Sequence, residues 1–122
     1  MDRLKQAFIK AGRWIKRSVR PLEVARWEYT FEGGPREKVL EILAAYQNED
    51  GGFGHGIEPD FWLPASSPMA SWAAACILLE VEAGSDLPMV QSVVDYLCRT
   101  QQPTGMWPAV LPENNAFPHA RW

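Results

Sequence analysis

Apolar residues recur every three or four positions along most of the chain, which is the spacing of one face of an α-helix. This pattern predicts helices over residues 2–20, 22–32, 36–47, 69–83 and 87–100. Apolar residues fill nearly every position of the segment 69–83, so we expect that helix to be buried on every side. Polar and apolar residues alternate nowhere over a length that would form a strand. The sequence therefore predicts an all-α protein.

Short polar residues and prolines mark where the later helices begin. Ser67 and Pro68 suit the N-cap and first helical position of the helix over 69–83. Asp86 is placed to cap the helix that follows. From Gln101 onward the chain is rich in proline and asparagine, and we expect it to be irregular.

A pattern over residues 39–53 recurs over residues 93–107, and each copy is a helix, a glutamine, a glycine and an aromatic residue. The matched positions are Gln47 with Gln101, Gly51 with Gly105, and Phe53 with Trp107. A glutamine amide can bond backbone groups that a helix end leaves unpaired. The glycine permits a sharp turn, and the aromatic ring can cover the glutamine. We therefore expect these six residues to be structural parts of a repeated helix pair.

The second copy has the order Tyr-Leu-x3-Gln-x3-Gly-x-Trp over residues 96–107, which resembles the QW repeat of squalene-hopene cyclases and their relatives. Residues 46–62, followed by Ser-Ser-Pro and a helix of small residues, are similar to bacterial prenyltransferase-like proteins. The resemblance covers roughly residues 22–122. It implies the α/α toroid of the terpenoid-cyclase and protein-prenyltransferase superfamily, in which an inner ring of paired antiparallel helices surrounds a central cavity.

The resemblance also predicts how the chain is organised. We expect one partial α/α-toroid domain over residues 1–122, with a basic amphipathic helix over 1–20, a first repeat over 36–84 and an incomplete second repeat over 86–122. Two helix pairs are too few to close a toroid. The sequence therefore predicts a fragment of a longer protein, or a unit that assembles with another chain or with itself.

Charge is distributed unevenly around a net value of −3. Residues 1–20 hold seven basic residues and one acidic residue, while the rest of the chain is acidic. An acidic body argues against nucleic-acid binding. The basic helix over 2–20 could lie on an anionic membrane surface, but we favour packing of its apolar stripe against the acidic body.

The tryptophans and cysteines are predicted to serve mainly as packing residues. Most of the six tryptophans occupy helical packing positions, while Trp62 and Trp72 are left open as cavity residues. Cys76 and Cys98 lie in predicted helices without metal-ligand spacing, so we expect buried, reduced thiols in a cytoplasmic protein. No apolar run reaches the roughly 18 residues of a membrane span, and no signal peptide is expected.

The loop after the first glycine turn carries the candidate chemistry, in His55, Glu58 and Asp60. Such a group could bind a metal or supply a general acid. Its spacing matches no metal-binding motif, so we expect neither a metal nor another cofactor. The resemblance places this loop beside an inner helix that begins at Pro68. It therefore implies that these three residues lie at the cavity rim as candidates for catalysis.

The resemblance implies a prenyltransferase-like or terpenoid-cyclase-like protein that handles a hydrophobic, isoprenoid small molecule. The acidic DxDD motif of class II cyclases and the Asp-Cys-His zinc set of prenyltransferases are both missing from the sequence. Whether the chain catalyses a reaction therefore stays open. Two alternatives are a non-catalytic helical-repeat binding module and an α/α-barrel carbohydrate-active enzyme, which would need paired carboxylates.

Overall fold

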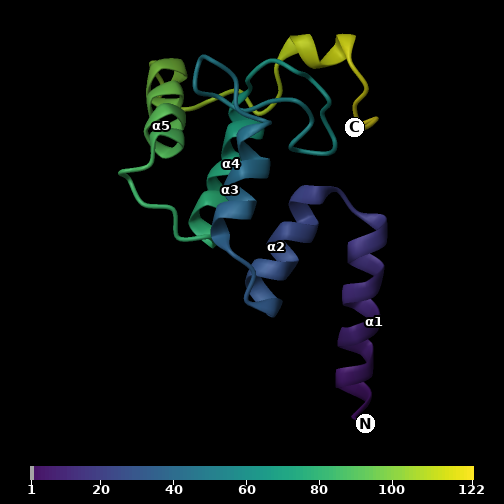
Figure 1. Cartoon of the computed structure of the whole chain (residues 1–122). Helices are drawn as coiled ribbons and strands as arrows, with labels where there is room; N and C mark the ends of the chain where they lie inside the picture. The colour runs from purple at the N-terminus through teal and green to yellow at the C-terminus, as the bar shows by residue number, and fades with distance from the viewer. Residues whose placement is uncertain (1) are drawn as a thin grey trace. The chain divides into compact units, whose positions relative to one another are not determined.

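The computed structural model describes residues 2–122 and confirms the all-α prediction, since no strand occurs among them. Its elements are α1 (Arg3–Ser18), α2 (Pro21–Glu32), α3 (Arg36–Ala44), α4 (Pro68–Glu80), α5 (Pro88–Thr100) and a 3₁₀ helix, η1 (Pro112–Ala116) (Figure 1). The chain forms two compact units, here called the N-terminal unit, which ends at Ile42, and the C-terminal unit, Leu43–Trp122. The sequence predicted one partial domain over 1–122, and the boundary between the units falls within α3.

In the N-terminal unit, α1 packs on α2 through an aromatic cluster. The Phe8 ring lies 5.0 Å from the Trp27 ring and 5.6 Å from the Phe31 ring, between ring centroids. Gly12 is buried beside the same indole, and a Cβ at Gly12 would lie 3.3 Å from Trp27 Nε1. A glycine here lets the two helices approach closely along one flank of α1.

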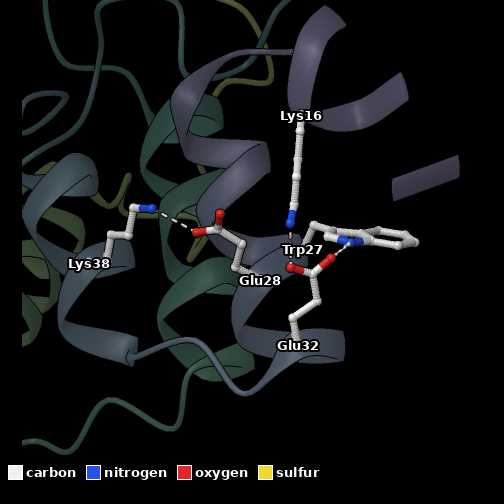
Figure 2. A network of polar contacts seen from close by, with 5 residues as sticks. All are labelled: Lys16, Trp27, Glu28, Glu32 and Lys38. Atoms are coloured by element: carbon white, nitrogen blue, oxygen red, sulfur yellow. Dashed lines mark hydrogen bonds and ion pairs between the residues drawn. The ribbon is translucent and has the colours of Figure 1, made fainter. Parts of the chain in front are cut away.

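A polar network joins the helices of the N-terminal unit (Figure 2). Lys16 Nζ lies 2.5 Å from Glu32 Oε2, while Trp27 Nε1 donates to the other carboxylate oxygen at 2.9 Å. The hydrogen bond between Lys16 and Glu32 raises the pKa of the lysine and lowers the pKa of the carboxylate. Lys38 and Glu28 form a second ion pair at 2.7 Å. Both lysines are exposed, so these ion pairs add little to stability.

The C-terminal unit is built on the packing of α4 against α5, with the first glycine turn buried beside them. Phe53 is fully buried, its N–H donates to Ser71 Oγ, and its carbonyl accepts from the Ser67 N–H, both at 3.0 Å. Ser67 Oγ in turn accepts from the N–H of Ala70 at 3.1 Å. The predicted N-cap at Ser67 and first helical position at Pro68 are confirmed.

The prediction that the helix over 69–83 is buried on every side is wrong. One face of α4 packs inward, but Trp72 is 61 % exposed, Leu79 is 78 % exposed and Cys76 is exposed as well. Cys98 on α5 is also exposed, so the predicted burial of both thiols is wrong.

Several helix ends also differ from the prediction. α3 ends at Ala44 and α4 at Glu80. Each helix ends about one turn before its predicted end, although apolar residues continue beyond it. Leu87 takes the N-cap position of α5 without a side-chain cap, so the predicted cap at Asp86 is wrong. The tail predicted as irregular contains η1.

Tryptophan burial was overestimated as well. Trp27 is half-buried, and the other five are exposed: Trp14, Trp62, Trp72, Trp107 and Trp122. The core role predicted for most of them is therefore wrong. None of the helices described over residues 2–122 has both the length and the apolar character needed to cross a membrane.

Candidate functional site

The two glycine turns that the sequence predicted as a repeat make the same hydrogen bonds. Gln47 Nε2 donates to the carbonyl of Gly51 at 2.9 Å, and Gln101 Nε2 donates to the carbonyl of Gly105 at 2.8 Å. Both glycines adopt the left-handed backbone conformation, with φ of +88° and +81° respectively. Each glutamine thus closes a turn at the end of its helix, and the glutamine and glycine positions of the two copies share one geometry.

The surroundings of the two turns differ. Gln47 also donates to the carbonyl of Met89 at 3.2 Å, which ties the first turn to the start of α5, and Phe53 beyond it is fully buried. In the second turn Trp107 takes the position of Phe53, and its indole N–H donates to the carbonyl of Leu97 at 3.0 Å. The first turn therefore belongs to the core, while the second leaves an aromatic ring at the surface beside the end of α5.

That surface ring forms one wall of an apolar groove in the C-terminal unit. The groove has a volume of about 380 Å³ and is lined by Pro68, Met69, Trp72, Ala75, Leu97, Trp107, Pro108 and Ala109. The Trp107 N–H is already bonded to Leu97, so this ring offers mainly its carbon face. None of the eight lining side chains is ionisable. The volume falls within the range of small-molecule sites, about 300–1,000 Å³.

The three predicted site residues line a different part of the unit. His55 is exposed with φ of +56°, and its Nε2 lies 2.8 Å from Asn48 Oδ1. Glu58 Oε1 accepts from the backbone N–H of Asp60 at 3.1 Å, which closes a local turn. The carbonyl of Asp60 accepts from the N–H of Ala120 at 2.8 Å. None of the three is among the groove residues, and their catalytic role stays a prediction.

This loop is also the part of the sequence that could have bound a metal. Across residues 2–122 there is no group of three or more His, Cys, Asp and Glu side chains that could hold a metal ion. Instead, Asp50 Oδ1 accepts from Ser66 Oγ at 2.6 Å and from the Gly52 N–H at 3.0 Å. Asn48 Nδ2 donates to Ser66 Oγ at 3.0 Å. These contacts hold the loop against the start of α4.

Sequence reasoning had raised Trp72 as a cavity residue but missed the rest of the groove. Its residues come from α4, α5 and the segment that begins at Trp107, and no local pattern joins these three places. One observation in the sequence could have indicated it. A helix apolar on all faces in so short a chain needs more partners than the chain supplies, so some of its surface must be open.

The comparisons with known proteins do not bear on the groove or on the repeat turns. Comparisons with protein-family models, with curated proteins and with solved structures gave no match to this chain. The likeness to terpenoid cyclases and prenyltransferases therefore stays a prediction that rests on the sequence pattern of the repeat and of residues 46–62.

Proposed function

We propose that this chain is a helical-repeat binding module that takes an apolar, isoprenoid-type ligand into the groove of the C-terminal unit. The observation that carries the proposal is the lining: eight apolar or aromatic side chains from three parts of the chain, around about 380 Å³. A branched hydrocarbon chain gains about 25 cal/mol of binding free energy for each Å² of apolar surface that it buries against such walls. The family resemblance supports an isoprenoid as the class of ligand, because that superfamily handles isoprenoids.

The proposal is binding and not catalysis because the groove offers no acid or base. A general acid must lie within hydrogen-bond reach of the reacting group, and none of the lining residues can serve. His55 and Glu58 instead make hydrogen bonds within their own loop. The same lining argues against the carbohydrate-active alternative, which needs two carboxylates flanking the scissile bond.

The expected affinity is modest. Ligands of this size gain about −0.3 kcal/mol per non-hydrogen atom. Farnesol, an isoprenoid alcohol of about sixteen such atoms, would gain about −5 kcal/mol, which corresponds to a Kd on the order of 0.1 mM. Trp72 is largely exposed, so the groove is open on one side and encloses the ligand only in part.

The test is equilibrium dialysis of the whole chain against farnesol. Wild type is expected to bind with a Kd on the order of 0.1 mM. Ala75→Phe, which fills the groove, is expected to weaken binding at least tenfold. Ala116→Phe adds the same ring at an exposed position outside the groove and should bind like wild type.

Two results would overturn the proposal. One is a wild-type chain that takes up no farnesol at millimolar ligand. The other is an Ala75→Phe variant that keeps its helical circular dichroism and binds like wild type. If Ala75→Phe does not fold, Trp72→Ala removes one exposed wall of the groove and is expected to weaken binding by a similar factor.

A further inference from the structure

In the N-terminal unit, an apolar stripe of α1 is left uncovered by α2. The packing flank of α1 carries Phe8 and the buried Gly12, which meet Trp27 of α2. Because successive residues of an α-helix are 100° apart, a second set of apolar side chains lies beside this flank on the helix surface. The set is Leu4, Ala7, Ala11 and Trp14, here called the α1 stripe, and all four are exposed.

The exposure of the stripe is large at its two biggest side chains. Leu4 is 78 % exposed and Trp14 is 59 % exposed. The sequence favoured packing of the apolar face of α1 against the protein body. The structure shows that only the flank with Phe8 and Gly12 is packed against α2, so the α1 stripe needs another partner.

Basic residues border the stripe along one edge. Helical positions place Arg3, Lys10 and Arg17 along this edge, while Lys5 lies beyond the packing flank on the same side as Lys16. All four are exposed, and α1 itself contains no acidic residue. Within residues 2–122, Arg3, Lys5 and Lys10 form no ion pair, whereas Lys16, on the packing side, is paired with Glu32 (Figure 2). The border of the stripe therefore carries positive charge with no internal counterion.

We propose that α1 binds the surface of an anionic lipid bilayer, with the stripe facing the acyl chains. An apolar helical stripe with tryptophan, edged by lysine and arginine, matches the chemistry of the headgroup boundary. Leu4 inserts below the headgroups, Trp14 lies at the interface, where indoles are enriched, and the bordering cations pair with lipid phosphates. This inference concerns the N-terminal unit and does not depend on ligand binding in the groove of the C-terminal unit.

The dependence of binding on lipid charge distinguishes an anionic membrane from an uncharged apolar partner. Each basic residue near an anionic surface contributes about 1 kcal/mol, which is about fivefold in affinity. The 122-residue chain is therefore expected to co-sediment with vesicles of 30 % phosphatidylglycerol in phosphatidylcholine. Binding to pure phosphatidylcholine vesicles should be at least tenfold weaker, and 0.5 M salt should weaken the anionic binding. Equal binding to both kinds of vesicle, or no binding to either, would overturn the proposal.

The charge variants localise the effect to α1. Arg3→Gln combined with Lys10→Gln is expected to weaken binding to the anionic vesicles about 25-fold, from two fivefold steps. The matched control, Lys38→Gln combined with Arg121→Gln, changes the net charge equally outside α1. The control should lose much less affinity, and an equal loss in both double variants would show that α1 is not the contact.

The apolar variants test insertion at constant charge. Leu4→Ser combined with Trp14→Ser should weaken vesicle binding at least tenfold. Leu79→Ser combined with Trp62→Ser is the matched control, because this leucine and tryptophan lie outside α1 and the groove and are 78 % and 60 % exposed. If the α1 pair binds vesicles as wild type does, the proposed insertion of the stripe into the bilayer is wrong.

Competing occupants of the stripe give different results in the same variants. If another part of the chain covers it, the α1 pair should lower the thermal midpoint clearly more than the control pair at Leu79 and Trp62. If a second copy covers it, wild type should sediment as a dimer and the α1 pair as a monomer. Either result would overturn the proposal.

Discussion

Gly51 offers the sharpest test of the first repeat turn. Its φ of +88° lies in the left-handed region, and a Cβ at this position would collide with the backbone carbonyl of Ser92 in α5. Gly105 is its counterpart in the second turn, with φ of +81°, but the nearest atom to a Cβ there is Gln101 Nε2 at 4.0 Å. The two positions share a backbone conformation and differ in the space around them.

The magnitudes follow from this difference. A left-handed conformation costs an alanine about 1–2 kcal/mol at either position. At Gly51 the added methyl also displaces the α5 backbone, and overpacking of this kind costs about 1–3 kcal/mol more. Alanine stiffens the unfolded chain equally in both variants, so that contribution cancels in the comparison. Gly51→Ala is expected to lose about 1–3 kcal/mol more unfolding free energy than Gly105→Ala.

The assay is urea unfolding of both variants and wild type, followed by circular dichroism at 222 nm. Gly51→Ala should unfold at clearly lower urea than Gly105→Ala, and Gly105→Ala should itself unfold at somewhat lower urea than wild type because of its left-handed backbone. Equal losses of unfolding free energy in the two variants would refute this prediction, because they would mean that the first turn is no more tightly enclosed than the second.

Three further predictions concern other parts of the C-terminal unit. Gln47→Ala should lower the unfolding free energy by about 1–2 kcal/mol and Gln101→Ala by less, since the first amide makes two hydrogen bonds and is partly buried; equal losses in urea unfolding would contradict this. Elemental analysis should find no stoichiometric zinc in wild type; one zinc per chain that is lost in His55→Ala would show this to be wrong. Burial raises the pKa of Tyr96, and the charge of Asp50 adds to the shift. The stability that the neutral Tyr96 side chain contributes is therefore complete below pH about 10 and is lost as the pH rises through the raised pKa. Tyr96→Phe should therefore lose less stability than wild type between pH 9 and pH 11, and identical losses would contradict the shift.

Much of the fold could be predicted from local residue patterns. All five helices, the N-cap at Ser67 and the glutamine–glycine positions are local features, because the hydrogen bonds involved join residues close in sequence. Short-range chemistry determines such features.

The misplaced residues share one physical cause. Apolar periodicity shows which residues could pack, but it does not show whether the chain has enough neighbours to cover them. Cys76, Leu79 and Trp72 lie on an apolar helix and are nevertheless exposed, because α5 covers only part of α4.

The candidate site was predicted less well because it is assembled from distant segments. His55 and Glu58 were chosen for their chemistry, yet in the structure they make hydrogen bonds within the loop. The groove joins α4 to Leu97 and Trp107, and only the tertiary packing brings these together. Of its lining, Trp72 alone was raised in advance as a cavity residue.

The most direct test of the proposed function is a farnesol titration of the ¹⁵N-labelled chain, followed by nuclear magnetic resonance. Amide shifts are expected to be saturable and concentrated at the groove residues with an N–H: Met69, Trp72, Ala75, Leu97, Trp107 and Ala109. His55 and the amides of α1 should shift little. Shifts spread over the whole chain, shifts centred on the His55 loop, or no shifts at millimolar farnesol would contradict a ligand site in this groove.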